Sequence, residues 1–167
     1  MSLPTSGETL LASAFELKRD LEGRFLELGR VLKLIRDSKA WSAHYQSFDN
    51  PANHNFLVDL GMKKSTANRL ILIYEKFVLE GGVSPTRLLE VGSGKLGETI
   101  AYIKNKEDVE EMLSLAVASP TQAVLRSRLR EIRTGVSQDD CAHNDTYEIT
   151  ICRSCGHRAS TSLSNAN

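Results

Sequence analysis

The sequence is poor in aromatic residues and proline, and it has no excess of either charge. Among its 167 residues, 6% are aromatic, four are proline, and 21 Lys and Arg balance 21 Asp and Glu. This balance excludes a protein that is basic overall, although local basic patches are compatible with it. No apolar run approaches the roughly 20 residues that a membrane-spanning helix needs. We therefore expect a globular protein of one domain, with or without a small additional module, and no contact with a membrane.

The beginning of the sequence also lacks the features of a secretory signal. The first ten residues, MSLPTSGETL, contain neither a basic segment nor an apolar stretch. On this ground we expect a cytoplasmic protein.

Helical patterns cover the chain from its start to about Thr134. Over residues 8–38, apolar residues recur at spacings of three, four and seven, which predicts one long helix that Gly23 or Gly29 can bend or break. This helix is expected either to brace a helical bundle or to form a homodimer contact. Turn and capping residues predict further helices, which begin near Pro51, Ser65, Ser84, Ser93, Glu107 and Ser119.

Residues 53–72 have the pattern of two helices joined by a tight turn. Apolar residues give each helix a face that packs against the other, and Gly61 permits the positive φ of the turn. The stretch LGMKKSTANRLI resembles the helix-turn-helix of bacterial, plasmid and phage DNA-binding proteins. It has Leu57 where a small residue is more common and Ala67 where a branched residue is more common. The resemblance implies that the second helix enters the major groove of DNA.

The second of these helices begins with side chains that suit contacts with DNA. Lys binds phosphate, Ser and Thr bind phosphate or bases, and Asn and Arg form bidentate bonds with bases. Residues 61–77 contain four basic residues and one acidic residue. A helical hairpin with a purely structural role is the alternative interpretation. The candidate DNA contacts in this helix are Lys63, Lys64, Ser65, Thr66, Asn68 and Arg69.

A basic stripe is also expected on the last long helix. Arg126, Arg130 and Arg133 fall on one helix face, and residues 119–137 contain four arginines and one acidic residue. Such a stripe binds phosphates and makes the affinity for DNA strongly dependent on salt. A solvated or ion-paired helix face is an equally good interpretation of the same pattern.

The cysteines predict a structural zinc site near the carboxyl terminus. All three lie in the last 27 residues, and an odd number in one short segment is a poor disulfide framework. Cys152 and Cys155 form a CxxC knuckle, and Cys141 and His143 supply the other half of a tetrahedral site. His157 is the substitute ligand if His143 points away. With four protein ligands the zinc would be structural, and the short segment around it resembles a zinc-ribbon or treble-clef finger that needs the metal to fold.

These patterns predict a mainly α fold, in which a multi-helix body contains the helix-turn-helix and is followed by a small zinc-finger hairpin. Alternating residues predict one strand over residues 146–151. The expected divisions are a body over residues 1–134, a linker over 135–140, a zinc finger over 141–158 and a disordered tail over 159–167.

The function that these patterns favour is DNA binding, as a transcription regulator or accessory factor of a bacterium, phage or plasmid, with double-stranded DNA as the partner. The alternative is an adaptor or inhibitor that binds a protein through the finger or the first helix. We expect no enzyme, since His44 and His54 lack an identifiable nucleophile or carboxylate partner. A nuclease with an unfamiliar arrangement of residues is the least favoured interpretation.

Overall fold

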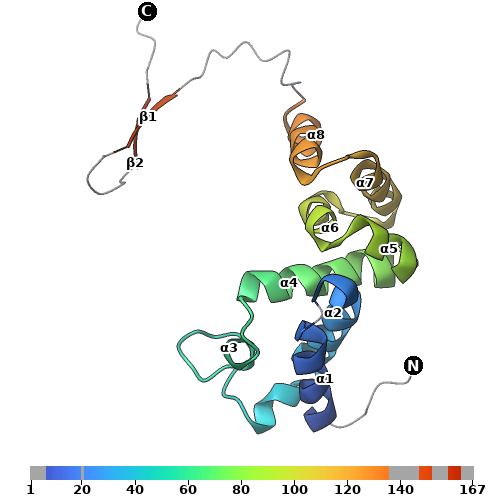
Figure 1. The fold of residues 1–167 in the computed structure, drawn as a ribbon, viewed down its shortest axis with the longest axis vertical. Helices are drawn as coiled ribbons and strands as arrows, with labels where there is room; N and C mark the ends of the chain where they lie inside the picture. Colours follow the sequence, from blue (N-terminus) through green and yellow to red (C-terminus); the bar gives the residue numbers. More distant parts are fainter. Residues whose placement is uncertain (1–6, 20, 136–146, 152–157, 163–167) are drawn as a thin grey trace, which may run out of the picture. The chain divides into compact units, whose positions relative to one another are not determined.

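The computed structural model describes residues 7–19, 21–135, 147–151 and 158–162, and most of these are helical (Figure 1). The chain divides into two compact units after Leu129, inside its last long helix. This division precedes the expected boundary at residue 134. Leu129 is the last buried side chain of that helix, whereas Ile132 is 52% exposed. None of the helices that the structure describes has the length and apolar character required to cross a membrane.

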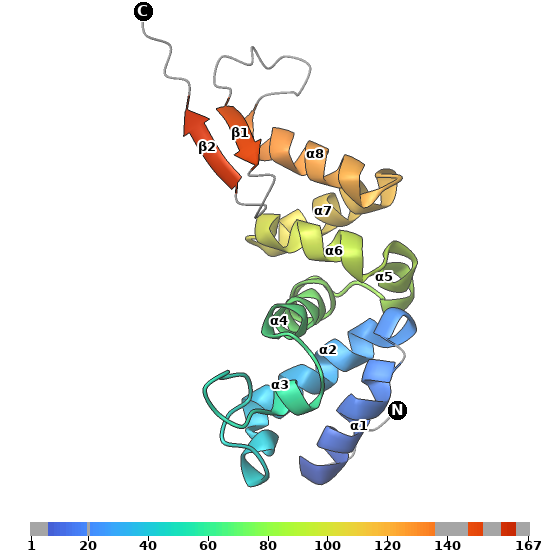
Figure 2. The same cartoon turned by 60° about the vertical axis from the view of Figure 1, so that its left-hand side comes forward.

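The first part of the chain forms two helices instead of the single helix that the apolar pattern predicts. α1 (Gly7–Arg19) and α2 (Leu21–Ser38) lie side by side (Figures 1 and 2). Arg24, with φ −127° and ψ 20°, departs from helical geometry near the start of α2, whereas Gly29 is helical and buried. The prediction of one long helix is therefore wrong. Folding back buries the apolar stripes of both halves against each other, since Ala14 and Leu28 are each 0% exposed.

The helices predicted to begin near Ser65, Ser84, Ser93, Glu107 and Ser119 are confirmed. Two short 3₁₀ segments lie at Ala40–Ala43 (η1) and Ile100–Tyr102 (η3), and a π-helical segment, η2 (Tyr74–Glu80), continues α4. The remaining helices are α3 (Phe56–Asp59), α4 (Lys64–Ile73), α5 (Pro85–Val91), α6 (Ser93–Thr99), α7 (Lys106–Ala118) and α8 (Gln122–Thr134).

The helix α4 packs mainly on α2, and α6 lies between α4 and α7 (Figures 1 and 2). Gly29 permits the close approach of α2 and α4, because a Cβ at this position would stand 2.4 Å from the carbonyl oxygen of Leu70. Ala67, Leu70 and Ile71 were expected to seat α4 against the preceding helix, but α4 packs mainly on α2, and α3 has only four residues. The core of the described residues is mainly aliphatic, with four phenylalanine rings buried in it: Phe25, Phe48, Phe56 and Phe77.

The second unit contains an antiparallel pair of strands. β1 (Tyr147–Ile151) confirms the predicted strand and pairs with β2 (Arg158–Ser162), with Tyr147 opposite Ser162 and Ile151 opposite Arg158. β2 falls in the segment expected to be disordered, so that prediction is wrong for residues 159–162. Strand pairing uses backbone hydrogen bonds, so the polar side chains of β2 do not prevent it from pairing with β1.

Candidate nucleic-acid interface

The start of α3 is fixed by Asn55, which is only 3% exposed. Its Oδ1 accepts a hydrogen bond from the backbone of Val58 at 2.9 Å, which caps the helix, and its Nδ2 donates to the carbonyl oxygens of Asn50 and Asn53. The helix predicted to begin at Pro51 therefore begins at Phe56. No helix begins at Pro51, because backbone carbonyl oxygens of the loop before α3 accept hydrogen bonds from the buried Asn55 amide.

A tight turn at Gly61 connects α3 to α4. Gly61 has φ +64°, its N–H donates to Val58 O at 2.8 Å, and the N–H of Met62 donates to Leu57 O at 2.9 Å. This pair of bonds is the Schellman ending of a helix, which favours glycine at the left-handed position. Leu57 and Ala67, the two departures from the usual helix-turn-helix pattern, are 2% and 0% exposed. Both side chains belong to the core, which holds the turn in place.

The amino-terminal turn of α4 presents polar side chains to solvent. Lys63, Lys64, Ser65 and Arg69 are exposed, while Thr66 and Asn68 are half-buried. Its first turn contains no acidic residue. The opposite face of the helix is buried and consists of Ala67, Leu70, Ile71 and Ile73.

One of these lysines has a partner that the sequence pattern did not indicate. Lys64 Nζ lies 3.0 Å from Asp49 Oδ2, and the two side chains are 59% and 30% exposed. An exposed pair of this kind contributes little to stability and exchanges readily with solvent. Lys64 therefore remains available to an external anion, although Asp49 reduces the local positive charge.

A shallow groove with an apolar floor lies beside the turn. Leu57, Met62 and Pro51 contribute to it, together with Val58, which is 66% exposed, and Lys63 lies among the residues that line it. An exposed branched side chain next to a lysine suits either the methyl groups of DNA bases or the side chains of a protein.

Arg69 and Arg126, which are 57 residues apart in the sequence, both lie near Glu98 of α6. Arg126 Nη2 donates to Glu98 Oε1 at 2.7 Å. Arg69 runs over the neighbouring Gly97, where a Cβ would stand 2.5 Å from Arg69 Cδ. The hydrogen bond from Arg126 holds the pKa of Glu98 below its ordinary value, helped by a bond from Gln122 and by the charge of Arg69. The structure thus connects the start of the arginine stripe to α4.

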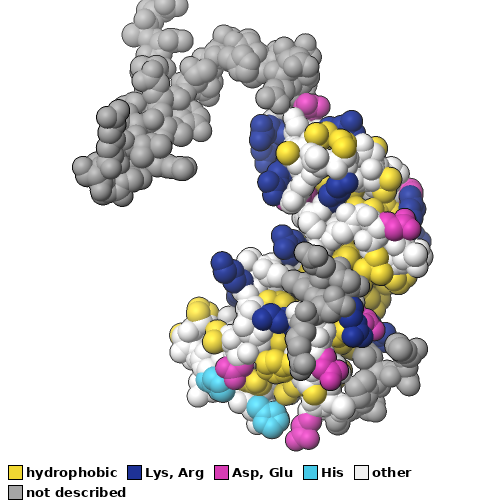
Figure 3. Space-filling model, in the orientation of Figure 1, with side chains coloured by type: hydrophobic (Ala, Val, Ile, Leu, Met, Phe, Trp, Pro, Cys, Tyr) yellow, Lys and Arg dark blue, Asp and Glu magenta, His cyan; other side chains and the backbone are white. Residues whose placement is uncertain are grey.

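The two other candidate arginines follow in α8. Arg130 and Arg133 are exposed, and they belong to the second unit, whereas Arg126 belongs to the first. Figure 3 shows exposed Lys and Arg side chains over α4 and over α8.

The five candidate zinc ligands, Cys141, His143, Cys152, Cys155 and His157, lie outside the residues that the structure describes. Within the described ranges, no three His, Cys, Asp or Glu side chains converge in a way that would hold a metal ion. The predicted site therefore stays a prediction that depends on the carboxyl-terminal segment alone.

His54 has a carboxylate partner that its surroundings in the sequence did not identify. Its Nε2 lies 3.2 Å from Asp59 Oδ2, and the ring of Tyr45 packs on it with centroids 5.1 Å apart. Burial raises the pKa of the Tyr45 hydroxyl, with a further contribution from the charge and hydrogen bond of Asp59. His54 and Asp59 are 57% and 42% exposed, so this cluster orders the loop before α3 without enclosing a site.

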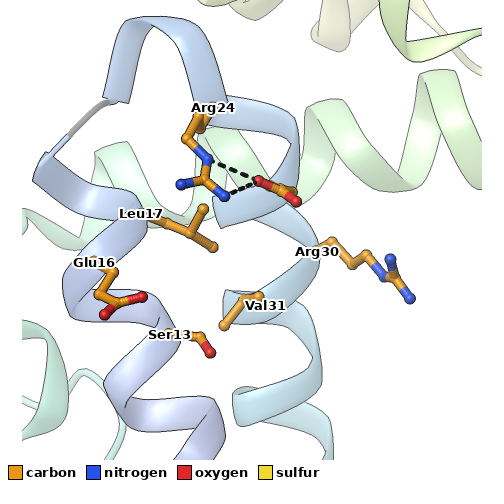
Figure 4. A pocket seen from close by; sticks show the side chains of 7 residues that line it. Ser13, Glu16, Leu17, Arg24, Arg30 and Val31 are labelled. Atoms are coloured by element: carbon orange, nitrogen blue, oxygen red, sulfur yellow. Dashed lines mark hydrogen bonds and ion pairs between the residues drawn. The ribbon is translucent and has the colours of Figure 1, made fainter. Parts of the chain in front are cut away.

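A second hollow, between α1 and α2, offers no convergent chemistry (Figure 4). Arg24 is held by Glu27, with Nη2 to Oε2 at 2.8 Å, and the Arg30 side chain points away from the hollow. Since the cations at this hollow are paired or turned outward, we assign it no ligand.

Comparisons with protein-family models, with curated proteins and with solved structures find no match to this chain. We therefore infer the function from the residues and their geometry.

Proposed function

We propose that the protein binds double-stranded DNA, with α4 in the major groove and the arginines of α8 against the phosphate backbone. The observation that carries the proposal is the contrast between two faces of α4. Its amino-terminal turn, which follows the tight turn at Gly61, is exposed, and the opposite face of the helix is fully buried. A helix that enters the major groove needs this division between a reading face and a packing face.

Each candidate side chain, exposed or half-buried, has a defined part in this proposal. Lys63 and Lys64 bind phosphates at the edge of the groove, and Ser65 and Thr66 bind phosphate or a base edge. Asn68 and Arg69, one turn further on, are the side chains suited to bidentate bonds with adenine and guanine. In α8, Arg126, Arg130 and Arg133 supply the salt-dependent part of the affinity.

We further propose that a structural zinc ion organises the carboxyl-terminal segment, held by Cys141, His143, Cys152 and Cys155, with His157 as the substitute. The sequence supports this, because the CxxC pair lies between the strands β1 and β2, which pair with each other. We expect one zinc ion per chain in metal analysis. Cys152→Ser/Cys155→Ser should abolish zinc binding and leave the helical signal in circular dichroism nearly unchanged. Retention of zinc by this variant would contradict the assignment.

The biological role that fits this proposal is that of a transcription regulator or accessory factor in the cytoplasm of a bacterium, encoded by its chromosome, a plasmid or a phage. This role is inferred from the resemblance of residues 53–72 to helix-turn-helix proteins. The second candidate function is that of an adaptor that binds a protein. The specific observation in its favour is the groove beside α3, where Val58 is 66% exposed.

Fluorescence anisotropy of labelled duplex DNA over a series of salt concentrations tests the proposal. We expect wild-type protein to bind with an affinity that falls steeply with salt, and Lys64→Ala/Arg69→Ala to bind far more weakly. The salt slope of this variant should also be lower, by about 0.9 for each phosphate that the protein no longer neutralises. The matched control is Lys104→Ala/Lys106→Ala, which removes the same charge from two exposed positions outside the proposed interface.

Two outcomes would overturn the proposal. The first is an absence of duplex binding by the zinc-loaded protein at low salt. The second is an equal decrease of affinity in both double variants, because the effect would then reflect net charge alone. Binding of a protein ligand that Val58→Asp abolishes would favour the adaptor.

A further inference from the structure

The Glu98 side chain accepts two short hydrogen bonds from α8 on a single oxygen. Gln122 Nε2 and Arg126 Nη2 each lie 2.7 Å from Glu98 Oε1. The Glu98 side chain is 26% exposed, so solvent and ions still reach the cluster, and that of Arg126 is 57% exposed. Glu98 is thus a surface carboxylate whose Oε1 accepts two hydrogen bonds from α8 and whose side chain is still partly exposed to solvent.

Arg69 approaches the same carboxylate from α4. The lack of a side chain at Gly97 makes room for it, because a Cβ there would stand 2.5 Å from Arg69 Cδ and 3.2 Å from Arg69 Cγ. The charge of Arg69 contributes to the lowered pKa of Glu98, after the effects of Arg126 and Gln122. Arg126 therefore binds the carboxylate directly, whereas Arg69 acts on it through its charge, and we call these three residues the Glu98 cluster.

The Glu98 cluster has two positive charges and one negative charge. A guanidinium has five N–H donors, and the bond to Glu98 Oε1 uses one group of Arg126, Nη2. A DNA phosphate can therefore reach either arginine, but it must compete with the carboxylate for their charge. Because any phosphate meets the same competition, the penalty falls on DNA of every sequence.

We propose that Glu98 tunes the affinity for DNA: it competes with backbone phosphate for Arg126 and Arg69 and so lowers the sequence-independent part of the affinity. This inference rests on the proposed DNA binding.

Glu98→Gln tests this inference because it removes the charge and keeps the length of the side chain and one oxygen acceptor. With a labelled duplex of random sequence, we expect its affinity to rise about two- to fivefold over wild type, the range of an exposed ion pair. The salt slope should become steeper by up to about 0.9, since one more phosphate is neutralised. In an Arg126→Ala background, Glu98→Gln should raise the affinity much less.

Glu110→Gln is the matched control, because Glu110 is an exposed carboxylate that also pairs with an arginine, Arg87, away from α4. Unchanged or reduced affinity of a folded Glu98→Gln variant would overturn the inference. So would an equal rise in Glu110→Gln, or a rise that persists undiminished without Arg126. If wild-type protein itself fails to bind duplex at low salt, the proposed function is overturned as well. Thermal unfolding of each variant verifies that it is folded.

Discussion

Two clusters of charged side chains connect separate helices of the first unit, and they differ in their balance of charge. In the first, Glu75 of η2 lies 3.0 Å from Arg36 Nη2 and 3.3 Å from Lys33 Nζ of α2. Asp37 pairs with the same two cations. Two positive charges thus meet two negative charges, and this Glu75 cluster is neutral.

The Glu98 cluster joins helices in a similar way but carries one unmatched positive charge. Its carboxylate binds Arg126 directly and has Arg69 close by. A neutral cluster has little attraction for an outside anion, so its role is to connect α2 to η2. A cluster with an excess cation performs the same connection and also attracts phosphate. The net charge of a cluster therefore distinguishes a structural network, such as the Glu75 cluster, from a candidate binding surface, such as the Glu98 cluster, even where the residue types are similar.

The largest expected effect comes from Gly29→Ala, which disturbs the packing of α4 on α2. The helix α2 also carries both cations of the Glu75 cluster. The new Cβ would stand 2.4 Å from Leu70 O, a backbone atom that cannot rotate away, so α2 and α4 must separate. We expect the free energy of unfolding to fall by about 1–3 kcal/mol, which is typical of overpacking. Urea denaturation followed by circular dichroism measures it.

Gly7→Ala is the control for this prediction. Its Cβ would stand 3.5 Å from the nearest atom, Ala40 Cβ, an ordinary contact, and alanine is the better helix former. Its unfolding midpoint should therefore stay the same or rise slightly. Equal stability of Gly29→Ala and wild type would show that α2 and α4 do not cross as closely as described.

The next effect separates the two clusters by function. Arg126→Ala should weaken the binding of duplex DNA several-fold at low salt and reduce the salt slope by the amount expected for about one phosphate. Arg36→Ala removes the same charge from the neutral cluster and should leave both quantities nearly unchanged. Anisotropy titrations of the two variants, side by side, make the comparison. If Arg36→Ala weakened binding as much as Arg126→Ala, charge balance would not distinguish the clusters.

A smaller effect is expected in the dependence of stability on pH. Arg126 lowers the pKa of Glu98, and the hydrogen bond from Lys33 lowers that of Asp37. The folded state therefore binds fewer protons than the unfolded state, so the stabilisation is present at neutral pH and is lost as the pH falls through the lowered values. Glu98→Gln should lower the unfolding temperature by about 1–3 °C at neutral pH.

The same measurement at acid pH tests the sign of this effect. As the pH falls through the lowered pKa of Glu98, the carboxylate of the wild-type protein becomes protonated, and the difference from Glu98→Gln should shrink toward zero. A difference that grows as the pH falls would contradict the assigned direction of the pKa shift. Asp37→Asn, in the neutral cluster, should behave in the same way, because its carboxylate is also stabilised by cations.

Much of the helical body could be predicted because the signals that start these helices are local. Asn105 caps α7 with a reciprocal bond from Asp108, and Pro85 occupies the first turn of α5. The start of α3 could not be predicted in this way. Asn55 is selected as the cap because it is buried, whereas the sequence offers equally good capping residues just before Pro51.

The candidate interface was only partly predictable for the same reason. The exposed cations of α4 follow from the helix pattern. The carboxylates that pair with the predicted cations, Asp49 and Glu98, lie 15 and 28 residues from Lys64 and Arg126, and no sequence periodicity links them. A bend or break was expected at Gly23 or Gly29, but α1 already ends at Arg19, where the apolar stripe is continuous and gives no signal. These ion pairs could not be predicted because their partners are far apart in the sequence, although the residue types are ordinary.

The smallest effect is expected for the pair of Arg87 and Glu110, which joins α5 to α7. It has bidentate geometry, with Nη1 to Oε2 at 3.0 Å and Nη2 to Oε1 at 2.6 Å, and Arg87 lowers the pKa of Glu110. Both side chains are largely exposed, at 44% and 62%, so solvent and salt screen the attraction. Glu110→Gln should leave the unfolding temperature almost unchanged in a thermal melt at moderate salt. A clear decrease of the unfolding temperature would mean that good hydrogen-bond geometry alone makes an exposed pair stabilising. The stability contributed by the Glu98 cluster would then come more from its hydrogen bonds than from its charge.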